Sequence, residues 1–301
     1  PKTAQSPPVH ISRRSKMNTS TTADRSTREE EGCSPACAHY AFTAVGERGD
    51  ASCLHHKELQ DNLRQWGMLE SFSVTQFKFC PGFIRHEEAS FMRQLLSFAV
   101  EMCHENQQAQ IRMGIQSVQW EPLNCTAMSM DFFDCLVQRG IVSESGNIRG
   151  CYSDVFDGVG VSDKLKELLV NPESENADVF SEDQTQELLF HVFKTLCVGG
   201  GVCQPDDRLK AYTQAAKMLY KDLVSVRKSP STGELEIAPC KVYRVTGVNG
   251  GEGAHNGSST AVASLFSSVG DSGSPHHVCL VVVDLDKRRA SVLRNEFVSF
   301  W

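Results

Sequence analysis

The sequence predicts an α+β fold, in which one globular domain combines a mixed or antiparallel sheet with a central group of helices. Segments with helical hydrophobic spacing are grouped in the middle of the chain, and segments typical of strands lie toward both ends. This order disfavours a regular alternation of strands and helices. Residues 278–283 are apolar on both faces, which predicts a strand in the centre of the sheet.

The composition is that of an ordinary soluble globular protein, with 40% hydrophobic and 22% charged residues among 301. A net charge of −7 argues against nucleic acid as a partner, because that requires a basic surface. The longest apolar stretch is far too short to span a bilayer, and no apolar leader segment is visible, so we expect a cytosolic protein without a membrane partner. The 12 cysteines are scattered and include no CxxC pair, which predicts free thiols.

Residues 1–54 are expected to form a disordered tail. This segment is rich in Ser, Thr, Arg and Glu and has few large apolar side chains, so it cannot bury enough surface to offset the entropy of ordering. The folded domain is then expected over 55–301, with a flexible Gly/Ser-rich insertion at 247–275. A group of Cys and His residues between 33 and 56 does not have the spacing of a common zinc module.

The first half of the domain contains elements with clear periodicity. A helix at 56–69 places Leu59, Leu63 and Trp66 on one side, and Gly67 is its expected end. The expected elements that follow are a strand at 71–79, a helix at 86–106, a strand at 109–120, a helix between Ser129 and Gly140, and a helix at 162–171 capped by Ser162. Residues 148–161 are rich in turn-forming residues, and we predict neither a helix nor a strand there.

Two amphipathic helices are predicted between residues 180 and 230. Ser181 and Gln184 have the spacing of a capping box, in which each side chain bonds the other residue's backbone N–H. Apolar residues then recur with helical spacing up to Leu196, and the glycines at 199–201 end the helix because glycine adopts the left-handed conformation without strain.

The second of these helices is expected to start after Pro205, with Asp206 and Asp207 in its first turn. Its apolar face is expected to comprise Leu209, Tyr212, Ala216, Leu219, Tyr220, Leu223 and Val226. Beside that face runs a line of four lysines, Lys210, Lys217, Lys221 and Lys228. Two interpretations stay open, a solvated flank that keeps the protein soluble or a docking stripe for an acidic partner.

Three strands are predicted in the C-terminal part of the chain. They lie at 234–245, at 277–284 and at 290–300, and the last two are joined by a tight turn at Asp286 and Lys287. The short connection predicts an antiparallel pair.

No motif in the sequence supports an active site. Residues 270–275, GDSGSP, resemble the nucleophile loop of trypsin-like proteases, but the chain is too helical for that fold and lacks the expected histidine base. The glycines at 199–201 follow a helix and lack the lysine of a phosphate-binding loop, and those at 158 and 160 are interpreted as a turn. Asp222 is interpreted as a surface charge or a partner contact. We therefore predict no catalytic residue, cofactor or metal.

Four segments carry a resemblance to a known family. They are LRQWGML at 63–69, CTAMSMDFF at 125–133, LLFHVFKTLCVGGGVCQ at 188–204 and LYKDLVSVRKSP at 219–230. These segments are similar to the cilia- and flagella-associated protein 300 family, and the closing segment VVVDLDKRRASVL resembles that family's C-terminal hairpin.

The resemblance implies a non-enzymatic factor for assembly of the outer and inner dynein arms of motile cilia and flagella. Members of that family are expected to move between the cytoplasm and the axoneme. Their expected partners are dynein assembly factors of the PIH-domain co-chaperone type, with dynein subunits as further candidates. The family has no assigned catalytic residues, so none is transferred.

Two alternatives remain beside this adaptor hypothesis. The lysine line could bind the acidic tails of tubulin, which would make the protein a structural component of the axoneme. The glycine turns could instead belong to a nucleotide-binding enzyme, which would require a polar pocket beside Gly199 or Gly158.

Overall fold

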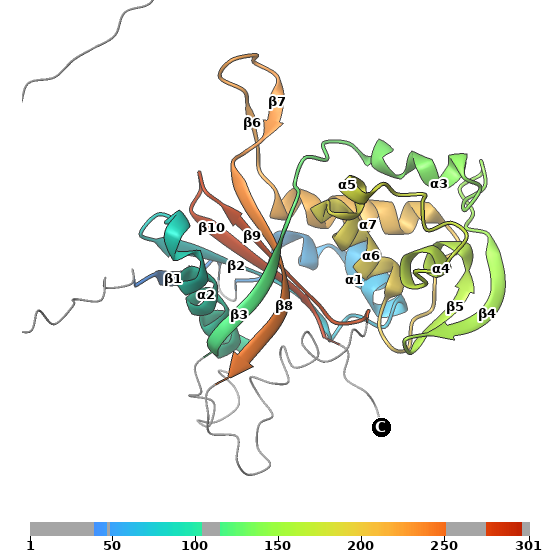
Figure 1. Cartoon of the computed structure of the whole chain (residues 1–301), viewed down its shortest axis with the longest axis horizontal. Coiled ribbons are helices and arrows are strands. Elements are labelled where there is room, and N and C mark those ends of the chain that lie inside the picture. The colour runs from blue at the N-terminus through green and yellow to red at the C-terminus, as the bar shows by residue number, and fades with distance from the viewer. Residues whose placement is uncertain (1–38, 47–48, 104–114, 251–274, 297–301) are drawn as a thin grey trace, which may run out of the picture. The chain divides into compact units, whose positions relative to one another are not determined.

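Six antiparallel strands form the central sheet of the protein, in the order β1-β2-β10-β9-β8-β3 (Figure 1). The computed structural model describes residues 39–46, 49–103, 115–250 and 275–296. The strands of this sheet are β1 (Ala41–Ala44), β2 (Phe72–Cys80), β3 (Ile115–Leu123), β8 (Cys240–Gly250), β9 (Val278–Asp284) and β10 (Arg289–Asn295). The predicted α+β fold is confirmed, and every pairing in the sheet is antiparallel.

The predicted position of β9 is also confirmed. It lies between β8 and β10, and its side chains are buried on both faces of the sheet. Leu280 and Val282 pack with the larger helical layer, whereas Val281 and Val283 pack on the opposite side. The tight turn between β9 and β10 is stabilised by the Asp284 carboxylate, which accepts a hydrogen bond of 2.8 Å from the backbone N–H of Lys287.

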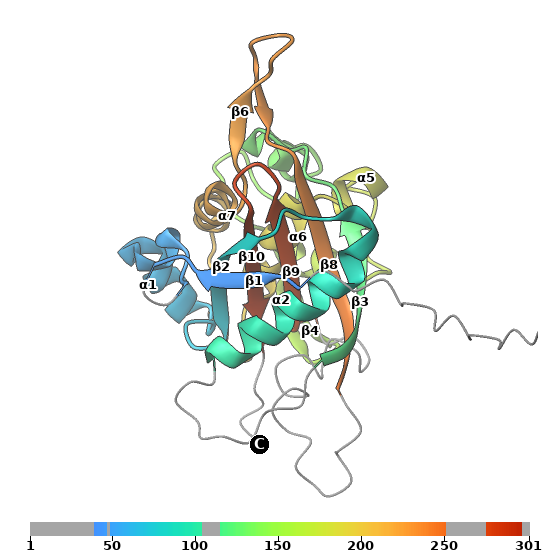
Figure 2. The same ribbon diagram turned by 90° about the vertical axis from the view of Figure 1, so that its left-hand side faces the viewer.

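The sheet is covered by helices on both faces. The helix α2 (Glu88–Cys103), preceded by the short η2 (Arg85–Glu87), lies across one face (Figure 2). Aromatic side chains fill this side, where Phe91 makes edge contacts with Tyr40, Phe79 and Phe83. The remaining helices lie on the opposite face (Figure 1).

The larger helical layer is built around α1 (Lys57–Gln65), α6 (Leu188–Val198) and α7 (Leu209–Leu223). As predicted, Leu59 and Leu63 of α1 are buried, and so is Trp66 directly after the helix. The shorter helices of this layer are η1 (Ser52–His55), η3 (Met130–Phe133), α3 (Asp134–Gln138), α4 (Lys164–Val170) and α5 (Glu182–Thr185). Apolar side chains of α1, α3, α4, α6 and α7 and of the sheet share one continuous core.

Two glycines allow the end of α1 to approach the end of α6 very closely. The backbone N–H of Gly200 donates a hydrogen bond of 2.9 Å to the carbonyl of Trp66. A Cβ atom at Gly200 would lie only 2.1 Å from the carbonyl oxygen of Gly67. Gly199 has a φ of 71° and ends α6, which confirms the predicted helix stop.

Two small hairpins extend the domain. One joins β4 (Gly150–Phe156) to β5 (Val159–Asp163), and the other joins β6 (Val226–Lys228) to β7 (Leu235–Ile237). The β6–β7 hairpin projects away from the sheet as an arm at the top of Figure 1. Arg227 anchors it through ion pairs to Glu236 at 2.9 Å and to Asp286 at 3.1 Å.

The predicted boundary of the tail at residue 54 is wrong. Strand β1 and all but the last residue of η1 lie within residues 39–54, and β1 pairs with β2 over its whole length. Although this segment has few large apolar residues, Tyr40 and Phe42 are both aromatic and pack against Phe91. These contacts bury enough surface to order the strand. Similarly, β8 continues to Gly250, into the range predicted as an insertion, while 251–274, with all of the GDSGSP motif except Pro275, lie outside the described residues.

The helix predicted after Ser181 is divided into α5 and α6. The capping box of Ser181 and Gln184 is confirmed, but the helix is interrupted after one turn. The interruption is caused by two backbone hydrogen bonds to Asn124, both at 2.8 Å. The N–H of Asn124 donates to the carbonyl of Gln186, and the N–H of Leu188 donates to the carbonyl of Asn124. This bridge to a neighbouring segment replaces the helical hydrogen bonds at that point.

Other boundaries also differ from the prediction. Helix α4 is capped by Asp163 rather than Ser162, since the Asp163 carboxylate accepts from the N–H of Lys166 at 2.8 Å. Helix α7 begins only at Leu209, because the Asp206 carboxylate accepts from the N–H of Arg208 before the helix starts. The strand predicted at 234–245 is two strands in different sheets, separated by Pro239, which has no N–H to continue a ladder.

Substitution of Gly200 by alanine tests the close approach of α1 and α6. The added Cβ would overlap the Gly67 carbonyl, so we expect Gly200→Ala to lower the free energy of unfolding by about 1–3 kcal/mol. Gly160→Ala is the matched control, because a Cβ there meets no atom within 4 Å, and its unfolding free energy should stay the same or rise by about 0.4–1 kcal/mol. Equal urea midpoints for the two variants would contradict the prediction.

Candidate partner-binding surfaces

Three of the four predicted lysines share one exposed face of α7. We define the lysine face as Lys210, Lys217 and Lys221, all of which are exposed. In the described part of the chain, none of them lies within 4.0 Å of a carboxylate. The opposite side of the helix is buried through Tyr212, Ala215, Ala216, Leu219 and Leu223. The helix is thereby held so that its lysines stay in solvent.

Lys228 does not belong to the lysine face, which corrects the prediction of a four-residue line. The helix ends at Leu223, because Val224 is extended and buried, and Lys228 lies in β6 opposite Leu235. Val226, predicted on the apolar face of the helix, is likewise in β6 and is 57% exposed.

Asp222 has a structural role rather than a place on the exposed face. Its carboxylate accepts hydrogen bonds from the backbone N–H of Cys53 at 2.6 Å and from the Ser52 hydroxyl at 3.0 Å. Its backbone carbonyl accepts from the Gln76 amide and the Arg289 guanidinium at 3.0 and 3.2 Å. The residue therefore joins the end of α7 to η1 and to the sheet, and its charge does not interrupt the lysine face.

The four segments that carry the family resemblance meet in the helical layer. In the first segment, the Trp66 carbonyl accepts a hydrogen bond of 2.9 Å from the N–H of Gly200 in the third segment, and the Trp66 ring stacks on Tyr212 of α7 with ring centroids 4.6 Å apart. In the second segment, the N–H of Thr126 donates to the buried Glu187 carboxylate at 3.0 Å, beside the start of α6. The Cys125 thiol lies 3.5 Å from the Tyr220 hydroxyl of the last segment. These residues form the contacts that hold the layer together.

The glycine turn after α6 is filled by protein atoms and does not provide a phosphate site. A Cβ at Gly199 would lie 2.6 Å from the Cys203 sulfur, and the Gly199 carbonyl is 2.9 Å from the Nδ1 atom of His276. A carbonyl oxygen can only accept, so Nδ1–H of His276 donates to it, and burial lowers the pKa of this imidazole. Nearby, the buried Lys166 ammonium donates to the Cys203 sulfur at 3.6 Å.

His191 is a half-buried titratable group in α6. Burial and, to a smaller extent, the positive charges of Arg244 and Lys194 together lower its pKa to about 3. The imidazole is therefore neutral in the folded protein at physiological pH. Below its ordinary pKa of about 6.5, the unfolded chain binds a proton that the folded protein does not.

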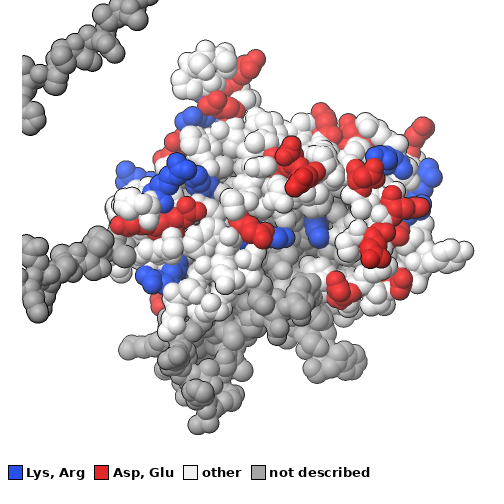
Figure 3. Space-filling view, viewed as in Figure 1, with Lys and Arg blue, Asp and Glu red and all other residues white. Residues whose placement is uncertain are grey.

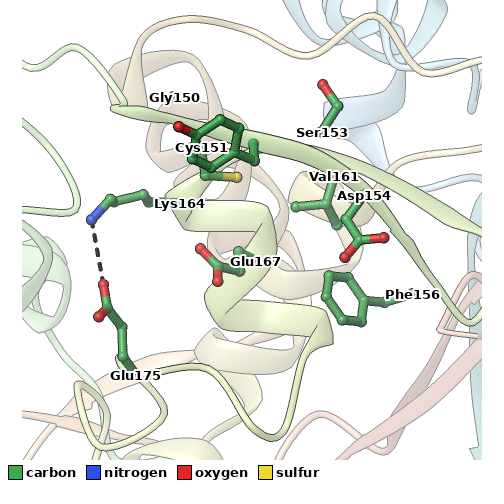
Figure 4. A pocket seen from close by; sticks show the side chains of 10 residues that line it. Gly150, Cys151, Ser153, Asp154, Phe156, Val161, Lys164, Glu167 and Glu175 are labelled. Carbon is green, nitrogen blue, oxygen red and sulfur yellow. Dashed lines mark ion pairs between the residues drawn. The ribbon is translucent and has the colours of Figure 1, made fainter.

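A pocket of about 600 Å³ lies between the β4–β5 hairpin and α4 (Figure 4). Strand β4 bulges here: Gly150 pairs with Asp163 and Asp154 pairs with Val161, so β4 advances four residues while β5 advances two. The pocket lies where the bulged part of β4 faces α4, since Cys151, Tyr152 and Ser153 of the bulge line it together with Lys164 and Glu167. The turn of this hairpin, at Asp157 and Gly158, has φ values of 48° and 79°.

The pocket combines an apolar floor with carboxylates. Phe156 and Val161 line it from the hairpin, and Glu167 points into it from α4 (Figure 4). Asp154 and Glu175 add two further carboxylates at its rim. The cation among its lining residues, Lys164, forms an ion pair with Glu175 at 3.5 Å. The pocket therefore carries a net negative charge.

Sequence reasoning missed this pocket and its hairpin. Residues 148–161 lack an alternating hydrophobic pattern, because most side chains of β4 are exposed. The Asp157-Gly158 pair was the available signal, since this dipeptide favours a hairpin turn with positive φ at both residues.

Within the described residues, no group of three or more His, Cys, Asp or Glu side chains is placed to hold a metal ion. Every cysteine with a described side chain is a free thiol. The same residues contain no helix with the length and hydrophobicity needed to cross a membrane.

The chain matches the model of a known family over nearly all of the described residues. The family is described as cilia- and flagella-associated protein 300, and the match covers residues 39–295. This chain belongs to that family. The resemblance carried by the four segments is thereby confirmed, and membership associates the chain with cilia and flagella.

Two relatives of the same description show the extent of the similarity. The protein from Paramecium tetraurelia is 28% identical over 255 residues, which cover 84% of this chain and 93% of the relative. The protein from Chlamydomonas reinhardtii is 34% identical over 174 residues, which cover 57% of this chain and 63% of the relative. No solved structure matches the chain.

Acid should destabilise the protein partly through His191. The pKa of His191 is about 3 in the folded protein and about 6.5 in the unfolded chain. The unfolding free energy therefore keeps its full value above about pH 6.5 and decreases as the pH falls below it. Between pH of about 7.5 and 5, we expect His191 to account for a loss of about 1–2 kcal/mol in unfolding free energy. Urea titrations of His191→Gln should show a correspondingly shallower pH dependence, and an unchanged dependence would contradict the assignment.

Proposed function

We propose that this protein is a non-enzymatic adaptor or assembly factor for the outer and inner dynein arms of the axoneme. The observation that carries the proposal is the family match over residues 39–295, together with relatives from two organisms that are named for cilia and flagella. In this role the protein moves between the cytoplasm and the cilium or flagellum. Its activity supports axoneme organisation and motility.

The lysine face supports a binding role in this function. Its three ammonium groups lie on one side of a well-packed helix and have no carboxylate within 4.0 Å among the described residues. A row of cations of this kind attracts a complementary acidic surface and guides its approach. The proposed partners are dynein assembly factors of the PIH-domain co-chaperone type, and dynein subunits that such factors hold.

The alternative of a nucleotide-binding enzyme has weaker support. The Gly199 turn is occupied by the Cys203 side chain, and Gly158 forms a hairpin turn. The pocket beneath that hairpin carries excess carboxylates, which repel a phosphate group.

Removal of the protein from ciliated or flagellated cells tests the proposed function directly. We expect axonemes that lack outer and inner dynein arms in electron micrographs, while dynein heavy chains remain in the cytoplasm. Re-expression of the full chain should restore the arms. Axonemes that keep both sets of arms would refute the proposal.

Charge reversal tests the lysine face separately. The triple change Lys210→Glu, Lys217→Glu and Lys221→Glu should weaken capture of dynein assembly factors about tenfold or more, because attraction becomes repulsion. Unfolding free energy should change by only about 0.5 kcal/mol per site, since exposed charges contribute little. The matched control reverses the exposed lysines Lys57, Lys78 and Lys287 and should capture normally. If both triple variants behave alike, the lysine face is not the binding surface.

The same lysine face also fits a structural component of the axoneme that binds the acidic tails of tubulin. Sedimentation with purified microtubules separates this alternative from the adaptor. Direct binding that is weakened by salt and abolished by the lysine-face reversals would favour it, because exposed charge interactions are screened by ions.

A further inference from the structure

Strand β4 presents an edge that pairs with no other strand in the described part of the chain. It belongs to a sheet of two strands, and it lies at the outer margin beyond β5 and α4 (Figure 1). The backbone groups of an exposed edge can pair with another chain, and charges, prolines, bulges or cover usually limit such pairing. Here the bulge is confined to the stretch between Gly150 and Asp154, and beyond it Asp154, Val155 and Phe156 pair regularly with β5, so their outer edge keeps the geometry of a strand.

The side chains of this edge expose unusual apolar surface. Tyr152, within the bulge, is 99% exposed, and Val155 is 66% exposed. A fully exposed aromatic ring beside a pocket is the type of residue that contributes most to binding energy in protein interfaces. Phe156 and Val161 continue the apolar surface into the pocket.

The charges of the pocket indicate the kind of side chain that a partner would place in it. Acidic side chains are frequent over the region of α4, β4 and β5, at the right of Figure 3. Within the pocket, Glu175 is neutralised by Lys164 at 3.5 Å, but Asp154 and Glu167 form no ion pair in the described part of the chain. Two unneutralised carboxylates above an apolar floor match a long side chain with an apolar stem and a cationic end.

We propose that this pocket and the edge of β4 form a docking site for an extended, arginine-bearing segment of a protein partner. The segment pairs with the β4 edge as an added strand. An arginine enters the pocket with its stem on Phe156 and Val161 and its guanidinium on Asp154 and Glu167, while Tyr152 stacks on the planar cation.

Arginine suits this site better than lysine. Its planar guanidinium offers five donors in a fixed geometry that matches carboxylates, and it is less strongly hydrated than an ammonium. The site goes beyond the proposed function because it is separate from the lysine face and has the opposite charge. It would allow one protein to hold a basic segment and an acidic surface at the same time.

Binding of a defined peptide to the full-length protein tests the site. The probe is a fluorescein-labelled peptide of alternating valine and arginine, and its control replaces each arginine by citrulline, which keeps the shape without the charge. Fluorescence anisotropy at low salt should show binding of the arginine peptide and an affinity about tenfold or more lower for the citrulline peptide. Equal affinities, or no binding of the arginine peptide at about 1 mM protein, would overturn the proposal.

Variants locate the binding. Asp154→Asn combined with Glu167→Gln should weaken binding of the arginine peptide about tenfold or more, because it removes the charged acceptors. The control Glu182→Gln with Asp183→Asn removes two exposed carboxylates of α5 and should leave the affinity unchanged. Tyr152→Ala provides a second measurement, since its side chain is 99% exposed and its loss should weaken binding without unfolding the protein. Normal affinity in either pocket variant would overturn the proposal.

Discussion

The close approach of Gly67 and Gly200 is the constraint on which the larger helical layer depends. No side chain fits between these two backbones, because a Cβ at Gly200 would lie 2.1 Å from the Gly67 carbonyl. Beside this contact, Trp66 stacks on Tyr212 of α7. The two glycines thus hold α1 against α6 at the place where α7, which carries the lysine face, packs on the layer.

The two proposed surfaces arise from different structural principles. The lysine face is one side of a regular amphipathic helix whose other side is buried, so its position follows from ordinary packing. The pocket under β4 lies at an irregularity, the bulge between Gly150 and Asp154. Helix α7 lies on the main core, whereas the hairpin lies on a smaller cluster of its own that includes Val159, Val161 and Val170.

The sequence predicted elements correctly where buried residues recur at a regular spacing. Strand β9 is apolar on both faces and α1 has helical spacing, so both could be predicted from the residues alone. It failed where a distant contact sets the boundary, as when Asn124 interrupts α5 and α6. Lys228 was misplaced because helical spacing continues in the sequence beyond Leu223, where the chain becomes extended. The pocket could not be predicted, since a bulge is specified by register and not by composition.

Asp222 gives the end of α7 a mechanical role. Through Ser52 and Cys53 it holds the segment by which the chain enters the helical layer, and only a few residues later the chain leaves α7 for the β6–β7 arm. The arm also joins the sheet at its other end, where β7 is followed by β8, and through the ion pair of Arg227 with Asp286. The Asp222 carboxylate is therefore a clamp between the segment that enters the helical layer and the end of α7, and tension on the arm is shared between this clamp and the sheet.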